Sequence, residues 1–132
     1  MEWATRQRWG KLRIDFISDT NILIYVHEGN KLIEPFLKYN FGISFITEIE
    51  LLGFGGLTSI EEDKLRQLIK DCYELGWNND VKEQAILLRK KYVVKLPDAI
   101  IAATAIVHEL PLVTADRGLV KIEELDLIFL DV

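Results

Sequence analysis

Four acidic residues that lie far apart in the sequence occupy positions suited to a shared metal site. They are Asp19, Glu48, Asp98 and Asp116. Oxygen ligands of this kind suit Mg²⁺ or Mn²⁺ rather than zinc or copper. One or two such cations can neutralise a phosphodiester, lower the pKa of an attacking water and stabilise the leaving oxygen. If the fold brings the four carboxylates together, the sequence predicts metal-dependent hydrolysis.

Each acid taken alone also has an ordinary structural explanation. Asp19 fits the N-cap of a helix, and Asp98, which follows Pro97, fits a first helical turn. Asp116 is followed by an Arg-Gly pair and fits a turn. Glu48 lies between apolar residues, where an unpaired buried carboxylate would be unfavourable. Convergence of the four acids, rather than any single position, therefore decides between a structural and a functional role.

Apolar runs alternate with helical patterns along the chain, which is typical of βαβ units and a parallel sheet. We expect strands at residues 14–18, 41–45, 112–114 and 127–130. We expect helices at residues 20–27, 32–37, 47–52, 59–72, 79–91 and 98–108. The predicted fold class is α/β, with a central, mostly parallel sheet of four or five strands and helices on both faces.

This topology would place the acids along one edge of the sheet. Asp19 directly follows the first strand, Glu48 lies in the first turn of the helix after the second, and Asp116 follows the third. The carboxyl ends of the strands in an open parallel sheet share one edge, and ligands bind there. Helix N-termini would favour the ionised forms of Glu48 and Asp98. Four carboxylates gathered at this edge would repel one another and would need protons or cations to coexist.

Composition favours one cytoplasmic domain. The 132 residues suit a single domain, and the 49% hydrophobic content favours a sheet covered on both faces. No apolar stretch approaches the ~20 residues that a membrane span needs. Asp15 and Asp19 interrupt the apolar run that follows the basic N-terminus, so we expect no signal peptide. The single Cys72 suits a reducing compartment.

The formal net charge of −5 argues against a protein that holds nucleic acid by its overall charge. A bound divalent cation would answer this objection, because it would supply positive charge where the phosphate lies. Basic residues also gather just before Asp98, at Arg89, Lys90, Lys91 and Lys95. They could border an acidic site, but on their own they fit better the solvated C-terminal end of a helix.

Four segments resemble the signature blocks of PIN-domain proteins, and VapC-type toxins above all. They are residues 17–25 (ISDTNILIY), 44–48 (SFITE), 96–105 (LPDAIIAATA) and 112–117 (LVTADR). The blocks occur in the order and spacing of that family, from residue 16 to about residue 132, and the third is quite specific. The resemblance implies a PIN-like three-layer sandwich over residues 14–132, with residues 1–13 as an N-terminal extension that such toxins usually lack.

The same resemblance implies a function and a set of site residues. Asp19, Glu48, Asp98 and Asp116 would be the metal-binding and catalytic acids, with Asn21 and Thr114 as supporting polar residues. The family typically cleaves RNA with Mg²⁺ or Mn²⁺. Its toxin branch forms homodimers and is neutralised by a small antitoxin protein. We therefore expect a metal-dependent endoribonuclease, the toxin of a toxin–antitoxin pair.

Two other interpretations make different predictions. A catalytically silent PIN-like module would regulate a partner through an arm that contains Trp3 and Trp9, although retention of all four acids argues against it. A receiver-like domain would accept a phosphoryl group on Asp19, although the lysine expected in its last strand is missing. Trp77 and Tyr73 fit base stacking, but aromatic residues at such spacing are more often packed in the core.

Overall fold

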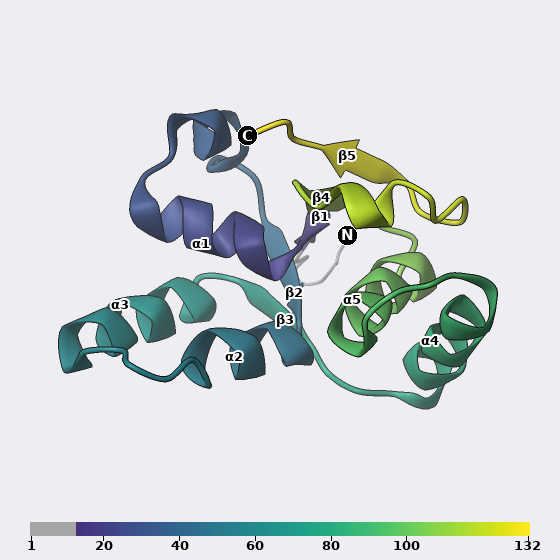
Figure 1. The fold of residues 1–132 in the computed structure, drawn as a ribbon. Coiled ribbons are helices and arrows are strands. Elements are labelled where there is room, and N and C mark those ends of the chain that lie inside the picture. Colours follow the sequence, from purple (N-terminus) through teal and green to yellow (C-terminus); the bar gives the residue numbers. More distant parts are fainter. Residues whose placement is uncertain (1–12) are drawn as a thin grey trace.

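The chain folds into a central sheet with helices on both sides (Figure 1). The computed structural model describes residues 13–132, so Trp3, Trp9 and nearly all of the predicted N-terminal extension lie outside the described residues. The strands are β1 (Phe16–Ser18), β2 (Phe41–Ser44), β3 (Tyr73–Leu75), β4 (Leu112–Thr114) and β5 (Leu127–Phe129). The helices are α1 (Thr20–Glu28), α2 (Phe45–Leu52), α3 (Ser59–Lys70), α4 (Asn79–Lys91), α5 (Leu96–Val107) and the 3-10 helices η1 (Lys31–Phe36) and η2 (Arg117–Leu119). None of these helices has the length and hydropathy needed to span a bilayer.

All five strands are parallel, in the order β3-β2-β1-β4-β5, which confirms the predicted α/β class. Ile17 of β1 pairs with Gly42 of β2 on one side and with Leu112 of β4 on the other. The chain runs outward from β1 to β2 and β3, then returns to the opposite side of β1 for β4 and β5. The strand order therefore reverses between β1 and β4. Such a switch point forms a crevice at the carboxyl ends of the strands, where ligands bind.

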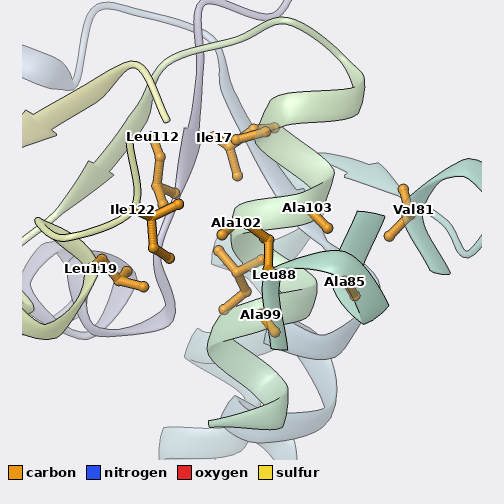
Figure 2. Close-up of a cluster of buried hydrophobic side chains, with 12 residues drawn as sticks. Ile17, Val81, Ala85, Leu88, Ala99, Ala102, Ala103, Leu112, Leu119 and Ile122 are labelled. Carbon is orange, nitrogen blue, oxygen red and sulfur yellow. The ribbon is translucent and has the colours of Figure 1, made fainter. Parts of the chain in front are cut away.

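Each face of the sheet has its own hydrophobic core, because successive side chains of a strand point to opposite faces. Figure 2 shows the first core, in which Ile17 and Leu112 lie in one cluster with Leu88 of α4 and Ala102 of α5. The adjacent residue Phe16 belongs to the second core, which includes residues of α1, η1 and α3. In Figure 1, α1 and α3 lie on one side of the strands and α4 and α5 on the other. The two cores hold β1 and β4, and hence the switch point, from both sides.

Local sequence signals set the ends of several helices close to their predicted positions. The hydroxyl of Thr58 accepts a hydrogen bond from the backbone N–H of Glu61, whose side chain accepts one from the Thr58 N–H in return, so a capping box begins α3. The side chain of Asn78 accepts from the N–H of Val81 at the start of α4. At the end of α1, Gly29 has φ +74°, a left-handed conformation that glycine adopts without steric penalty.

Several elements differ from the prediction, three of them for identifiable reasons. The strand Tyr73–Leu75 was not expected, because it is short, lies at the sheet edge and lacks the buried apolar run of the other strands. Residues 31–36 form a 3-10 helix that contains Pro35, which has no N–H to donate to a regular α-helix. α5 begins at Leu96, two residues before the predicted start, with Pro97 in its first turn.

Candidate active site

Asp19 lies at the switch point, where β1 ends and α1 begins. Its Oδ1 accepts a hydrogen bond from the backbone N–H of Thr20 at 2.8 Å, which makes Asp19 the N-cap of α1. Its Oδ2 accepts one from the hydroxyl of Thr114, on β4, at 2.7 Å. Burial raises the pKa of Asp19, the charges of Asp116 and Glu50 raise it further, and the two hydrogen bonds oppose them. The N-cap role is therefore compatible with a site role, because the capping carboxylate lies among other acids.

The two polar residues that the PIN resemblance adds to the acids differ in placement. The fully buried hydroxyl of Thr114 donates to Asp19 and accepts from the backbone N–H of Asp116 at 3.0 Å, so it links the ends of β1 and β4. Asp116 in turn accepts from the N–H of Gly118 at 2.8 Å, the turn geometry that its sequence context allowed. Asn21 is exposed on α1, and its side chain makes no hydrogen bond within residues 13–132. Thr114, but not Asn21, contacts an acid directly.

Asp98 lies in the first turn of α5, half-buried. Burial and the negative charges of Asp19, Asp116 and Glu50, in that order, raise the pKa of Asp98 to about 6, against a smaller opposing effect of Lys95. Carboxylates from the end of β1, from α2 and from the end of β4 are thus close enough to this side chain to resist its ionisation. Three of the four predicted acids, Asp19, Asp98 and Asp116, therefore come together at the carboxyl edge of the sheet.

The fourth predicted acid, Glu48, does not join them. Its carboxyl hydrogen-bonds with that of Glu74, on β3, and this contact is the main reason why the pKa of Glu74 is raised to about 7. Glu50 takes the expected place: its Oε1 accepts a hydrogen bond from the Thr20 hydroxyl at 2.6 Å, and its charge raises the pKa of Asp19 and Asp98. The structure therefore brings Asp19, Glu50, Asp98 and Asp116 near one another, here called the acidic cluster, and places Glu48 beside Glu74.

Helix geometry explains why the sequence did not distinguish these two glutamates. Two residues that are two positions apart in an α-helix are rotated by about 200° from each other around the helix axis. The buried residues of α2 are Thr47 and Leu51, and Glu48 and Glu50 flank this buried stripe on opposite sides. Either glutamate is compatible with the same apolar pattern. To choose between the two glutamates, one must know which side of α2 faces the start of α1. The apolar pattern of a single sequence does not contain that information.

The acidic cluster carries negative charge that the described residues do not neutralise with a direct ion pair. Within residues 13–132, no lysine or arginine forms a salt bridge with its four carboxylates, and Arg117, next to Asp116, pairs with Asp131 instead at 3.0 Å. Over the same residues, no three His, Cys, Asp or Glu side chains are already gathered at metal-binding spacing. Four neighbouring carboxylates, of which Asp19 and Asp98 have raised pKa values, nevertheless fit Mg²⁺ or Mn²⁺, because a dication would offset their repulsion.

The basic residues before Asp98 do not form a common border to this site. Lys91 pairs with Glu124 at 3.3 Å in the last turn of α4, as a solvated helix end would predict. Arg89 lines a groove beside α4. Lys95 alone affects the acidic cluster, since its charge lowers the pKa of Asp98.

The structure has two apolar grooves, of which the first reaches the acidic cluster. The first lies between α1, α2 and α3; its lining includes Ile24, Leu51 and Phe54, and it reaches Thr20 and Glu50. The second lies between α2, α4 and α5, and its mostly apolar lining also includes Lys82, Arg89 and Trp77. Trp77 is 60% exposed, so it is not the packed core residue that its spacing suggested.

Comparison with known proteins agrees with this architecture. A model of the PIN domain family matches residues 16–125. A chain of a toxin–antitoxin complex from Klebsiella pneumoniae is 31% identical, with a TM-score of 0.74 over 86% of this chain and 95% of that one. A chain of VapBC2 from Rickettsia felis is 21% identical, with a TM-score of 0.77 over 88% and 98%, and one of FitAcB from Neisseria gonorrhoeae is 20% identical, with a TM-score of 0.72 over 86% and 96%. At these two lower identities the likeness shows the fold alone. No curated protein sequence matches the chain.

Proposed function

The chain belongs to the PIN domain family, and from this premise we propose that it is a metal-dependent endoribonuclease, the toxin of a toxin–antitoxin pair. The observation that carries the proposal is the acidic cluster at the sheet switch point, where four carboxylates converge without a direct ion pair to a described lysine or arginine. The 31% identity to a chain of a toxin–antitoxin complex supports the toxin role. Family membership speaks against the receiver-like interpretation, and the complete set of acids speaks against a silent module.

Asp19, Glu50, Asp98 and Asp116 would hold the Mg²⁺ or Mn²⁺. Such a cation, when bound, supplies charge neutralisation of the scissile phosphate and activation of water. The protein's own part is positioning. Asp19 is fixed by hydrogen bonds to both of its oxygens, whereas Asp98 is half-buried and Glu50 is exposed. Asp19 would thus be held in place, while Asp98 and Glu50 are accessible to solvent. The solvent side of the site would therefore be open to an RNA backbone.

The decisive experiment expresses the full chain and its Asp98→Asn variant in bacteria and follows growth and RNA 5′ ends by sequencing. We expect growth arrest and new RNA ends with the unmodified chain, and neither with Asp98→Asn. Purified protein should lose RNA cleavage in EDTA and recover it with Mg²⁺ or Mn²⁺. Cleavage that persists in EDTA, or that Asp98→Asn retains, would refute the proposal. If the unmodified chain neither cleaves RNA nor arrests growth, the silent module becomes the better interpretation.

The proposed partners are those of the toxin branch. A small antitoxin would bind the groove between α1, α2 and α3, because that groove is apolar and ends at Thr20 and Glu50. A partner seated there would cover the acidic cluster and so block RNA. The test is co-expression with a candidate small antitoxin protein, which should abolish growth arrest. RNA and antitoxin would both meet the protein in the cytoplasm.

The proposal also includes a homodimer. The groove between α2, α4 and α5 is the surface that we expect a second copy to cover, because Trp77 and Leu96 expose 60% and 54% of their surface there. Analytical ultracentrifugation should show a dimer for the unmodified chain and a monomer for Trp77→Glu. A monomer at micromolar concentration for the unmodified chain would remove the dimer from the proposal without affecting the nuclease.

A further inference from the structure

A chain of buried hydroxyl groups ends on Glu50. The Oγ1 atoms of Thr47 and Thr20 are 3.1 Å apart, and Thr20 Oγ1 lies 2.6 Å from Glu50 Oε1. Thr47 is fully buried and Thr20 is 9% exposed. An ionised carboxylate only accepts hydrogen bonds, so Thr20 must donate its proton to Glu50. Its hydroxyl oxygen is then free to accept from Thr47, which fixes the direction of the chain as Thr47 to Thr20 to Glu50.

Thr20 also contacts the other side of the acidic cluster. Its backbone N–H donates to Asp19 Oδ1 at 2.8 Å, while its hydroxyl donates to Glu50 Oε1 at 2.6 Å. One residue therefore bonds to an oxygen of each of two acids that come from separate elements, the end of β1 and helix α2. This sets the separation of the two carboxylates, and Oδ2 of Asp19 is held independently by Thr114 at 2.7 Å.

Glu50 needs such a restraint more than the other acids do. It is exposed on α2 and its flexible side chain loses more rotamer freedom when fixed than an aspartate does. Within residues 13–132 the only side-chain hydrogen bond to its carboxylate comes from Thr20. Without that donor, nothing described in the structure would keep the carboxylate of Glu50 beside Asp19.

We propose that Thr20 is a positioning residue of the metal site, which orders Glu50 against Asp19, and that Thr47 acts on Glu50 only through Thr20. This inference rests on the proposed function, since it concerns the same acidic cluster. Residues that orient metal ligands in this way typically change metal affinity by about 10- to 100-fold when they are replaced. The hydroxyl, rather than the shape of the threonine, is the group that matters.

The test measures binding of Mn²⁺ alone to the full chain, by electron paramagnetic resonance of the free ion. Thr20→Val keeps the branched shape and removes the hydroxyl, and we expect it to weaken Mn²⁺ binding by about tenfold or more. Thr20→Ser restores a hydroxyl and should bind Mn²⁺ as the unmodified chain does. Thr104→Val is the matched control, because Thr104 is also a buried threonine but its hydroxyl donates to the carbonyl of Ile100 at 2.8 Å, within α5.

A double-mutant cycle tests the order of the chain. Thr47→Val should weaken Mn²⁺ binding on its own, but should have no further effect in the Thr20→Val background, because the path to Glu50 is already broken. Additive effects would refute the role given to Thr47. Melting curves in EDTA identify any variant that fails to fold; if Thr20→Val fails, Thr20→Ala and Thr20→Ser provide the same comparison with and without a hydroxyl.

The outcomes separate this inference from the proposed function. If the unmodified chain binds Mn²⁺ more tightly than Asp98→Asn does, and Thr20→Val binds as tightly as the unmodified chain, the positioning role is refuted and the metal site stands. If Thr20→Val and Thr104→Val lose affinity equally, the loss reflects general destabilisation and the role is likewise refuted. If the unmodified chain binds no better than Asp98→Asn, both the metal site and the positioning role are overturned.

Discussion

Helix α2 carries two glutamates, separated by one residue, whose surroundings differ completely. Glu50 accepts a hydrogen bond from Thr20 and adds its charge to Asp19 and Asp98. Glu48, on the opposite side of the helix, meets Glu74 in a surface pocket also lined by Arg66 and Lys70. Both arrangements place carboxyl groups near other carboxyl groups, so acidity alone does not identify the functional site.

The difference lies in how each arrangement accommodates its negative charge. In the pair Glu48 and Glu74, the hydrogen bond between the carboxyl groups favours a proton on Glu74, whose pKa is raised to about 7. The acidic cluster gathers more carboxylates around fixed donors, since Thr114 and the Thr20 N–H hold Asp19. Preorganised acceptors with remaining lone pairs suit a cation better than a proton. The pair is therefore a structural contact and the cluster a candidate site.

The largest expected effect is on the rate of RNA cleavage, when Glu50 or Glu48 is replaced by glutamine. Glu50→Gln should lower the initial rate of RNA cleavage in Mg²⁺ by about 100-fold, because it removes one ligand charge from the cluster. Glu48→Gln should leave the rate within about threefold, since a rim substitution away from the site usually has a small effect. Both variants keep size and helix propensity, so each serves as the control for the other. Equal losses, or a larger loss for Glu48→Gln, would show that we have assigned the wrong glutamate.

This pair also shows how far the sequence predicts the site. Asp19, Asp98 and Asp116 could be predicted because their position at a strand end or helix start fixes which edge they reach. The glutamate could not, because it depends on the rotation of α2 about its axis, and the buried stripe of Thr47 and Leu51 leaves both flanks equivalent. The contacts of the Thr20 hydroxyl depend on the same rotation, because its partners Thr47 and Glu50 both lie on α2.

The fold was predictable to a similar depth. Buried strands such as β1 and β4 carry apolar runs and were predicted, together with the alternation that gives a parallel sheet. The edge strand β3 is held mainly by its register with β2, in which Ile43 pairs with Glu74. Such a strand depends on pairing with β2, which is far away in the sequence, and its own three residues do not predict it. The contact of Glu48 with Glu74 could not be predicted for the same reason, because Glu74 lies on β3.

The next effect is on stability in the absence of metal. The pKa of Asp98 is raised to about 6 in the folded chain, so between its unfolded value near 3.8 and about 6 the folded state binds more protons than the unfolded state. Stability contributed by this group is thus greatest at low pH and is lost as the pH rises through 6. In EDTA, Asp98→Asn should be more stable than the unmodified chain at pH 7.5, by roughly 1 kcal/mol after allowance for solvent screening.

Urea denaturation in EDTA at pH 5 and pH 7.5 provides the measurement. The advantage of Asp98→Asn should shrink at pH 5, where Asp98 of the unmodified chain is protonated. Excess Mg²⁺ at pH 7.5 should stabilise the unmodified chain and leave Asp98→Asn almost unchanged, because only a folded, intact site binds the cation. If Asp98→Asn is less stable than the unmodified chain at pH 7.5, the charged carboxylate of Asp98 stabilises the fold instead of destabilising it, and the prediction is wrong.

The smallest effect concerns the proton shared by Glu48 and Glu74. Its hydrogen bond with Glu48 and partial burial raise the pKa of Glu74 to about 7, so the folded chain gains stability from this proton below pH 7 and loses it as the pH rises further. Glu74→Gln places a permanent amide donor against Glu48 and should remove this dependence. Because the pair is largely exposed, we expect a gain of only about 0.5 kcal/mol at pH 8. RNA cleavage should not change. A loss of cleavage in Glu74→Gln would connect β3 to the acidic cluster and remove the distinction between the two sides of α2, whereas an altered melting profile with full activity would strengthen it.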